Sequence, residues 1–421
     1  MNLSSDQQTA LDTILDFLTD PTEQEMVLGG PAGTGKTFLT GVILKEARKH
    51  APMMKLLLNN KYELNIVLTS STNKAAKVLQ DATGEEAKTI HKLLSLRVYN
   101  NYQTGKTSLK RDIDSEVIQN TLIVIDEASM INKDLLDIIR KLTMNCKVLY
   151  IGDPYQLAPV FENTAPVFNE IKKQIYLTTI QRQAAGSPII QFSQLFRDAL
   201  DGDPFPVIQT YGKEIQHVSS QDFQNKIDFE FKNMFDENAA RTVAWTNARV
   251  HELNSYIRHI TGHNKNYTIG ERLLTNKPIF NSTGGVAFNT DDIAEITQIT
   301  PDTLEDINGW KIELENRVTV FQAYNQAEVL HQIRTEAKLA KQTGIWSRYF
   351  TLKDAFADLR PIFACTCNKA QGSTYGTVFI DLNDIAKCTK DSDIIRMLYT
   401  SITRAKNSVV MTGFLPARLY E

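Results

Sequence analysis

Residues 29–38 read GGPAGTGKTF and follow the apolar run EMVL. The spacing fits G-x-x-x-x-G-K-[ST] between a strand and a helix, which is the context that gives this motif its meaning. Backbone N–H groups of such a loop close around phosphate oxygens, and the helix N-terminus adds its positive end. The pattern predicts a nucleotide site made by Gly30, Ala32, Gly33, Thr34, Gly35, Lys36 and Thr37. Lys36 would reach the β- and γ-phosphates, and Thr37 would ligate Mg²⁺.

Two further stretches supply the remaining chemistry of a nucleotide hydrolase. The apolar run LIVI ends in Asp126 and Glu127. Asp126 would hold Mg²⁺ through water, and Glu127 would position or deprotonate the attacking water. In GDPYQLAPV, residues 152–160, Gln156 stands after another apolar run, where it would sense the γ-phosphate. The expected cofactors are ATP and Mg²⁺.

Apolar runs alternate with helical patterns along most of the chain, which indicates α/β architecture with parallel sheets covered on both faces. A first set surrounds the glycine loop, and a second set includes residues 242–245, 361–366 and 377–381. The first expected domain spans residues 1–180 and contains a hairpin inserted at 95–118. The second combines residues 181–267 and 359–421. The segment between them, 268–358, is expected to be an inserted subdomain. That insertion begins with β-like stretches and ends with a helical pattern.

Composition narrows the class of protein. The 421 residues are 42% hydrophobic and 23% charged, with a formal net charge of −3. A negative net charge argues against nucleic-acid binding driven by the overall charge of the protein, but it is compatible with a local basic groove. No apolar run approaches a membrane span of ~20 residues, and the start, MNLSSDQQTALD, is not a secretory signal. Four cysteines without zinc-ligand spacing favour a reduced, cytoplasmic protein over a metal or redox role.

Ten stretches, in order, resemble the motifs of superfamily 1 helicases. Within that superfamily they are most similar to the Dda-type branch of T-even bacteriophages, with RecD and Pif-type relatives. The stretches are 3–7 (LSSDQ), 30–37 (GPAGTGKT), 68–76 (LTSSTNKAA), 89–91 (TIH), 125–130 (IDEASM), 152–160 (GDPYQLAPV), 177–182 (LTTIQR), 244–247 (AWTN), 366–374 (TCNKAQGST) and 399–405 (YTSITRA). The glycine loop alone is unspecific, whereas GDxxQLxP, KxQGxT and YTxxTRA in that order are highly specific.

The resemblance implies two RecA-like motor domains, a pin formed by the inserted hairpin, and a small β-barrel with a helical extension at 268–358. It implies an ATP-dependent DNA helicase that moves 5′ to 3′ on single strands. It implies that Gln7 reads adenine, that Arg182 and Arg404 reach the γ-phosphate, and that Gly372 links track and nucleotide. The implied DNA contacts are Thr72, Asn73, His91, Lys369, Ser373 and Thr374. Expected partners are single-stranded DNA, its junctions with duplex and a single-strand binding protein. We expect a monomer in the cytoplasm, which would be the host cytoplasm for a viral protein.

Two positions depart from the family pattern. Asn368 and Asn73 stand where relatives carry His, and an amide cannot stack on a base as an imidazole does. The hairpin leaves its own alternatives open. Tyr99 and Tyr102 would either form a wedge that stacks on a separated base, adding a DNA contact, or pack the hairpin. Trp346, Tyr349 and Phe350 would brace that hairpin or fill the core of the insertion.

Three other functions share parts of this pattern. A translocase that strips proteins from DNA has every motif and differs only in the wedge. A nucleotide-switched binding module would turn over little ATP, which Glu127 and the two arginines disfavour. A small-molecule kinase would need an acceptor site, and no motif supplies one.

Overall fold

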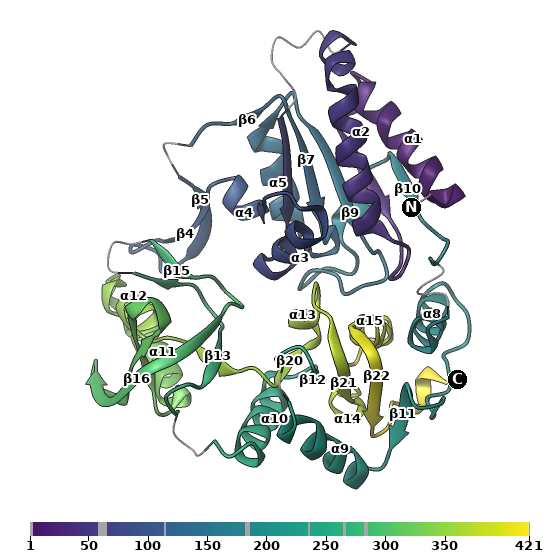
Figure 1. The fold of residues 1–421 in the computed structure, drawn as a ribbon. Coiled ribbons are helices and arrows are strands. Elements are labelled where there is room, and N and C mark those ends of the chain that lie inside the picture. Colours follow the sequence, from purple (N-terminus) through teal and green to yellow (C-terminus); the bar gives the residue numbers. More distant parts are fainter. Residues whose placement is uncertain are drawn as a thin grey trace. The chain divides into compact units, whose positions relative to one another are not determined.

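The computed structural model describes residues 3–57, 65–112, 115–181, 186–234, 236–263, 267–281 and 285–420. Its residue contacts divide the chain into two compact units (Figure 1). The first unit comprises Met1–Leu94, Glu116–Leu253 and Phe363–Glu421, and the second comprises Ser95–Ser115 and Asn254–Ile362.

The first unit contains a six-stranded parallel sheet. Its strand order is β10 (Gln174–Tyr176), β1 (Glu25–Gly29), β9 (Lys147–Gly152), β7 (Thr121–Asp126), β2 (Asn65–Ser70) and β3 (Ala87–Thr89). Strand β9 is buried along its whole length, as expected for a central strand covered on both faces. The helices of this part are α1 (Ser5–Thr19), α2 (Lys36–Leu57), α3 (Asn73–Thr83), α4 (Ile90–Leu93), α5 (Lys133–Leu142) and α6 (Pro166–Glu170). Two short strands, β6 (Ile118–Gln119) and β8 (Thr143–Met144), pair separately.

A second parallel sheet of five strands lies in the same unit. Its order is β11 (Ile215–Val218), β22 (Ala405–Thr412), β21 (Tyr375–Asp381), β12 (Ala240–Ala244) and β20 (Ala364–Thr366). Its helices are α8 (Pro188–Leu200), α9 (Ser220–Lys232), α10 (Asn247–Ile260), α13 (Cys367–Ala370), α14 (Leu382–Ile385) and α15 (Asp391–Ile402). Helices α8 and α15 lie side by side against it (Figure 1). The predicted α/β class with two parallel sheets is confirmed.

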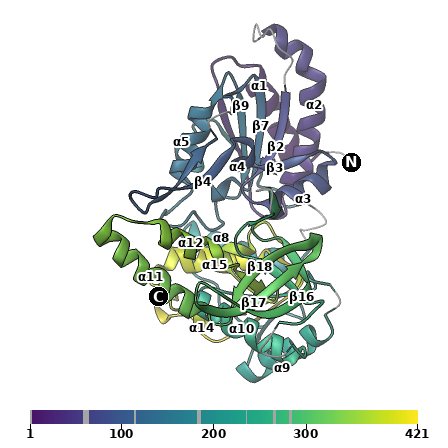
Figure 2. The ribbon, with the colours of Figure 1, turned by 90° about the vertical axis from the view of Figure 1, so that its left-hand side faces the viewer.

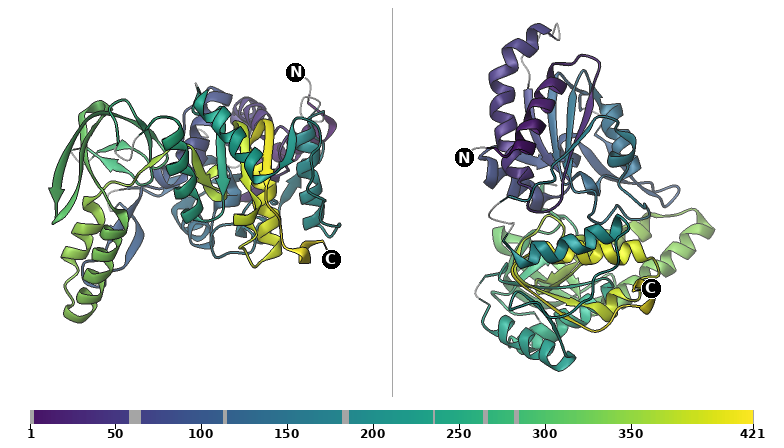
Figure 3. Two further views of the ribbon diagram at one scale, coloured as in Figure 1. Left: turned by 90° about the horizontal axis from the view of Figure 1, so that it is seen from below. Right: turned by 90° about the vertical axis from the view of Figure 1, so that its right-hand side faces the viewer.

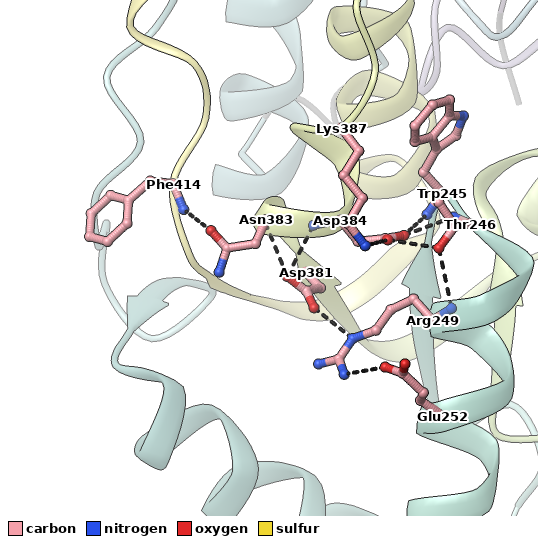
Figure 4. Close-up of polar contacts among 9 residues, drawn as sticks. All are labelled: Trp245, Thr246, Arg249, Glu252, Asp381, Asn383, Asp384, Lys387 and Phe414. Atoms are coloured by element: carbon pink, nitrogen blue, oxygen red, sulfur yellow. Dashed lines mark hydrogen bonds and ion pairs between the residues drawn. The ribbon is translucent and has the colours of Figure 1, made fainter.

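A polar network closes the carboxyl edge of the second sheet (Figure 4). Asp384, which is 1% exposed, accepts hydrogen bonds from the backbone N–H groups of Trp245 and Thr246, both at 2.8 Å. The Thr246 hydroxyl and the Lys387 ammonium donate to its other oxygen at 2.7 and 2.8 Å. Every acceptor direction of this carboxylate is therefore used, which fixes the turn between β12 and α10.

The second unit is built on an antiparallel sheet. Its order is β18 (Val318–Ala323), β17 (Ile307–Leu314), β16 (Ile293–Leu304), β13 (Arg272–Thr275) and β19 (Leu359–Pro361), with a separate pair β14 (Ile279–Phe280) and β15 (Val286–Phe288). The expected small barrel is a sheet with β18 and β19 at its edges. Two hydrogen bonds join the ends of this sheet among the described residues, from Ala357 N–H to Phe321 O at 2.7 Å and from Leu359 N–H to Gln322 Oε1 at 3.1 Å. Helices α11 (Gln326–Thr343) and α12 (Ser347–Ala355) pack together beside this sheet (Figure 2).

The predicted hairpin is present, and it belongs to the second unit by its contacts. Strands β4 (Leu96–Asn100) and β5 (Thr107–Arg111) pair antiparallel, and Gly105 in the turn has a φ of 69°. A Cβ on Gly105 would lie 2.2 Å from the Trp346 ring, so only glycine fits. Asn100 donates to Asp354 at 3.0 Å, and Figure 3 (left) shows the hairpin beside the two helices.

Candidate active site

The carboxyl edge of the first sheet gathers the motifs because parallel strands end at the same side. Four neighbouring strands lead into the segments with nucleotide chemistry, which are residues 177–181 after β10, 30–37 after β1, 152–157 after β9 and 126–127 at the end of β7. Strands β2 and β3 lead into Thr72 and His91, which are predicted DNA contacts. This edge therefore carries the nucleotide motifs after four strands and the predicted DNA contacts after the other two.

The glycine loop has the predicted geometry. Gly33 and Gly35 have φ values of 83° and 81°, in the left-handed region that glycine occupies without strain. The Lys36 ammonium donates to the carbonyls of Gly30 and Pro31 at 2.6 and 3.0 Å, so it lies inside the loop. The Thr34 hydroxyl donates to the Pro31 carbonyl at 2.9 Å within the loop, and a Cβ on Gly30 would lie 3.0 Å from that hydroxyl, so the loop is closely packed there.

A cavity of about 1170 Å³ opens at this loop. Ten predicted residues line it, namely Gln7, Ala32, Gly33, Gly35, Lys36, Thr37, Asp126, Glu127, Gln156 and Arg404. Arg404 comes from the second sheet, between α15 and β22, and the others come from the first. The structure therefore brings the predicted phosphate, metal and water-directing groups around one space large enough for a nucleotide.

The two acids of this cavity differ from ordinary surface carboxylates. Burial and the neighbouring Glu127 carboxylate raise the pKa of Asp126 to about 7, against the opposing effects of the Glu127 N–H and Lys36. Glu127 has a φ of 54°, a strained value for a residue with a side chain. The Ser71 hydroxyl donates to the Glu127 carbonyl at 2.9 Å, which ties the acid to the segment after β2. A cation beside Asp126 would favour its ionised form.

Gln156 is 5% exposed, and its Oε1 has no hydrogen-bond partner among the described residues. A buried amide oxygen without a partner is costly, at roughly 1–3 kcal/mol. Since Gln156 lines the cavity, a water or substrate group there would satisfy this oxygen. The arrangement fits a residue that orients the attacking water.

Arg404 is 7% exposed and bonds only to uncharged groups within the part of the chain that the structure describes. Its guanidinium donates to Thr400 O at 3.1 Å, to Thr403 Oγ1 at 3.1 Å and to Ser373 O at 3.4 Å. A buried permanent charge at a cavity wall without a carboxylate fits an anionic ligand. The other predicted arginine, Arg182, lies outside the described residues.

Six further residues line the cavity without a predicted role of their own, namely Leu3 and Ser4 of the motif at 3–7, Thr179, Ile180 and Gln181 of the motif at 177–182, and Phe38, which lies just after the glycine loop. The Phe38 side chain is 43% exposed although it is aromatic. With Leu3 and Ile180 it makes an apolar wall, and Gln7 supplies amide groups beside it. Such a wall suits the base of a nucleotide. Its position directly after the P-loop threonine was the signal that could have identified Phe38.

The first turn of α1 holds the predicted adenine-reading segment against the loop. Gln7 Nε2 donates to the Thr34 carbonyl at 3.0 Å, and a Cβ on Gly35 would lie 2.7 Å from that nitrogen. Asp6 accepts from the backbone N–H groups of Thr178 and Thr179 at 3.1 and 2.9 Å. Sequence segments 3–7 and 177–181 are thus joined over the P-loop.

The predicted track residues of the first sheet begin helices at its carboxyl edge. The Thr72 hydroxyl accepts from Ala75 N–H at 3.2 Å and caps α3, which begins at Asn73. Thr72, Asn73 and His91 are all partly exposed. Burial lowers the pKa of His91, so its imidazole is neutral at physiological pH. These side chains would meet a DNA strand with hydrogen-bonding groups rather than charge.

The predicted track residues of the second sheet differ in exposure. Thr374 is exposed and Lys369 is partly exposed. Ser373 is 2% exposed, and its hydroxyl has no partner among the described residues, so it lies below the surface. Gly372 has a φ of 68°, and a Cβ there would lie 3.0 Å from Ala75 Cβ and 3.8 Å from Glu127 Oε1. Gly372 thus lies between helix α3, which begins at the predicted DNA contact Asn73, and Glu127.

The two hairpin tyrosines have different surroundings. The Tyr102 ring meets Phe350 edge to face with centroids 4.8 Å apart, which is a packing role. Tyr99 is 48% exposed and lies under the Lys110 ammonium, 4.0 Å from its ring centre. Trp346 and Phe350 are buried in the core beside α11 and α12. Tyr102 is itself 56% exposed, so its contact with Phe350 accounts for part of the ring and both tyrosines stay accessible to a base.

Among the described residues, no helix is both long and apolar enough to cross a membrane. The described His, Cys, Asp and Glu residues form no group of three or more that could hold a metal. Thr37 and Asp126 are nevertheless sufficient protein ligands for Mg²⁺, which usually keeps several waters and binds substrate phosphates. The four cysteines are buried, and none of them forms a disulfide.

Two RecA-like parallel sheets around a P-loop cavity define a nucleotide-driven motor of the helicase class. A family model described as "AAA domain" matches residues 2–214, and one described as "UvrD-like helicase C-terminal domain" matches residues 361–412. Since the first model covers half of the chain, the protein belongs to that AAA domain family. The two matches together fit a superfamily 1 helicase of the Pif1, Dda and RecD type.

Similar proteins include an uncharacterised protein of Acanthamoeba polyphaga mimivirus, 25% identical over 97% of this chain and 99% of its own. The ATP-dependent DNA helicase dda of Enterobacteria phage T4 is 24% identical over 97% of this chain and 98% of its own. Among solved structures, Pif1 helicases at forked DNA match with a TM-score of 0.53, 18% identity and coverage of 100% of this chain and 94% of theirs. Bacteroides Pif1 with ADP-AlF3 and single-stranded DNA matches with a TM-score of 0.51, 17% identity and the same coverage. These structures support the fold.

Proposed function

We propose that this protein is an ATP-dependent DNA helicase that moves 5′ to 3′ on single-stranded DNA and separates duplex. The observation that carries the proposal is the cavity shared by two sheets. The first sheet contributes Lys36, Asp126 and Gln156, and the second contributes Arg404. Full charge stabilisation thus requires both sheets, so hydrolysis can be coupled to their opening and closing.

Each residue of the site has a role that follows from its position. ATP, when bound, would supply the phosphoanhydride bond, and Mg²⁺ would offset the negative charge of its phosphates. Lys36 and Arg404 stabilise negative charge on the transferring phosphoryl group. Glu127 and Gln156 hold the attacking water, and Glu127 takes its proton. Thr37 and Asp126 would hold the metal.

Gly372 gives the link between hydrolysis and movement. It lies between α3, which begins at the predicted track residue Asn73, and Glu127. A shift of either sheet would therefore move both Glu127 and the predicted DNA contact Asn73. Hydroxyl and amide groups bind phosphate without reading sequence, which suits a motor that steps anywhere. The 5′-to-3′ direction is the one that the Dda-type resemblance implies.

The domain assignment belongs to this proposal. We assign residues 1–180 to the first motor domain and 181–267 with 359–421 to the second. The inserted segments 95–118 and 268–358 would hold the separated strands. Contacts of the hairpin with Asp354, Phe350 and Trp346 support a braced wedge. We further propose a monomer that works on single strands beside a single-strand binding protein.

The test is unwinding of one duplex that bears a single-stranded tail on either its 5′ or its 3′ end. We expect ATP-dependent release from the 5′-tailed substrate alone. Release from the 3′ tail alone would contradict the direction and keep the motor. ATP hydrolysis that no nucleic acid stimulates would contradict the motor itself.

A protein-displacing translocase is the second candidate, and Tyr99 separates the two. Stacking on a base contributes about 1–3 kcal/mol, comparable with the average cost of one duplex step, ~1.4 kcal/mol. Tyr99→Ala should therefore slow unwinding several-fold and leave ATP hydrolysis on single-stranded DNA unchanged. Tyr102→Ala, which removes a packing contact, is the matched control for hairpin stability. Unwinding that Tyr99→Ala does not affect would favour the translocase.

A further inference from the structure

Helix α15 presents three side chains to the loop after β9. Arg396, Tyr399 and Thr400 are spaced i, i+3 and i+4, so they share one face of the helix. Tyr399 and Thr400 are 1% and 0% exposed. Neither Arg396 nor Tyr399 has a role in the proposed chemistry.

The loop at residues 153–157 is held largely by this face. Arg396 Nη1 donates to the carbonyls of Pro154 and Gln156 at 2.5 and 3.0 Å. The Leu157 N–H donates to the Thr400 hydroxyl at 3.2 Å. The Leu157 carbonyl accepts from Gln371 Nε2 at 3.2 Å. Gln156 is therefore flanked on both sides by backbone groups bound to the second sheet.

The Tyr399 hydroxyl joins the same loop to the P-loop. It donates to Asp153 Oδ2 at 2.6 Å and accepts from the Ala32 N–H at 3.0 Å. Hydrogen bonds to a charged group are stronger than those between neutral groups, so the short bond to Asp153 holds α15 to this loop strongly. One hydroxyl thus fixes the distance between the phosphate loop and the segment that carries Gln156.

We propose that Arg396 and Tyr399 are positioning residues that set where the Gln156 side chain stands in the cavity. The inference rests on the proposed ATP hydrolysis. Neither residue lines the cavity, so Arg396 acts through the loop at 153–157 and Tyr399 acts through that loop and the Ala32 N–H. A movement of α15 would move Gln156 relative to Ala32, and hydrolysis would depend on the position of the second sheet even before Arg404 engages.

The test is a double-mutant cycle on DNA-stimulated ATP hydrolysis. Tyr399→Phe removes the hydroxyl and keeps the ring. We expect kcat to fall about 10- to 100-fold, the range that loss of a hydrogen bond to a charged group allows, while KM for ATP stays within about threefold. In a Gln156→Ala background, the same change should lower kcat no further, because residues that act as one unit are not additive.

Tyr150→Phe is the matched control. Tyr150 is also fully buried, and its hydroxyl also donates to a carboxylate, Glu25, at 3.0 Å, but on the body of β9. The Tyr150→Phe variant should lose about as much folding stability as Tyr399→Phe, and its kcat should equal that of the wild-type protein. If Tyr399→Phe does not fold, Arg396→Lys, which keeps the charge and loses the paired donation, replaces it in the cycle.

Two results would overturn the inference. One is a kcat for Tyr399→Phe equal to that of Tyr150→Phe. The other is a full multiplicative loss in the Gln156→Ala background. Failure of the proposed function is distinguishable, because DNA would then not stimulate the wild-type protein, and the cycle could still be measured on basal hydrolysis.

Discussion

Asp126 and Asp384 both follow the buried part of a parallel strand, one on each sheet, yet their surroundings act on them in opposite directions. Burial and Glu127 raise the pKa of Asp126 to about 7. Burial also acts to raise the pKa of Asp384, but hydrogen bonds from Lys387, Thr246 and Trp245 hold it below the ordinary value. A carboxylate whose bonds are all made is structural. A buried carboxylate that lies beside another carboxylate and accepts few hydrogen bonds indicates a cation-binding or catalytic site.

The same contrast extends to the neighbours of these acids. Among the described residues, the cavity at the first edge has a strained Glu127 and a Gln156 oxygen without a hydrogen-bond partner, and Arg404 of the second sheet lines it without bonding to a carboxylate. At the second edge Arg249 donates to Asp381 at 2.8 Å, and Phe414 N–H donates to Asn383 at 2.9 Å (Figure 4). Around these two aspartates, the polar groups of the first edge are thus left open to a ligand, whereas those of the second edge satisfy one another. Matched substitutions at the two edges test this division.

Substitution of Arg404 and of Arg249 should give the largest difference in kcat. Arg404→Ala should lower kcat for ATP hydrolysis about 10³- to 10⁵-fold, as for arginines that contact a transferring phosphoryl group, with ATP binding nearly normal. Arg249→Ala should leave kcat within about twofold, because it loses bonds to Asp381 and Glu252 that lie away from the cavity. Steady-state kinetics and nucleotide titration measure both. Arg404→Lys, which keeps the charge, separates loss of the planar group from loss of charge. Unimpaired hydrolysis in Arg404→Ala would make that arginine structural.

The lysines should differ by a smaller factor. Lys36→Ala should lower kcat about 10²- to 10³-fold, the effect of losing one donor to developing charge, with the fold retained by circular dichroism. Lys387→Ala, at the exposed end of the Asp384 pair, should hydrolyse ATP normally. Equal activity of the two variants would remove Lys36 from the site.

The two aspartates should differ in how their stability effects depend on pH. The folded pKa of Asp126 exceeds its unfolded value of about 3.9, so the folded state binds more protons and stability falls as pH rises from about 4 to 7. Without metal or nucleotide, Asp126→Asn should therefore stabilise the protein by roughly 1–3 kcal/mol at about pH 8 and by less at about pH 5.

Asp384 has the opposite sign. Its lowered pKa gives stability that is present above the unfolded value and lost as pH falls through the folded one. Asp384→Asn should therefore destabilise by roughly 1–3 kcal/mol, with no change between about pH 5 and 8. Denaturant unfolding across this range measures both. Parallel curves for the two variants would contradict the contrast.

The sequence predicted the first edge better than the second for a physical reason. Phosphate and metal chemistry needs particular residues at fixed spacing, so Lys36, Asp126 and Gln156 could be recognised along the chain. The Asp384 network joins β12, α10 and α14, which are far apart in sequence, and any polar residue could have filled its positions. Ser373 matched a motif, yet its burial depends on packing that no motif encodes. Phe38 was missed because an apolar residue in a helix ordinarily enters the core.

Phe38 offers the smallest and most specific test of the division. If the apolar wall holds the base, Phe38→Ala should raise KM for ATP about tenfold, since stacking contributes roughly 1–3 kcal/mol, and should leave kcat at saturating ATP unchanged. Phe38→Leu should recover part of the loss, because apolar contact survives without stacking. Phe414, which is 78% exposed at the second edge, is the control, and Phe414→Ala should change neither constant. A fall in kcat for Phe38→Ala would instead show that the side chain positions the neighbouring Thr37, and the base would then be held by Gln7 and Ile180 alone.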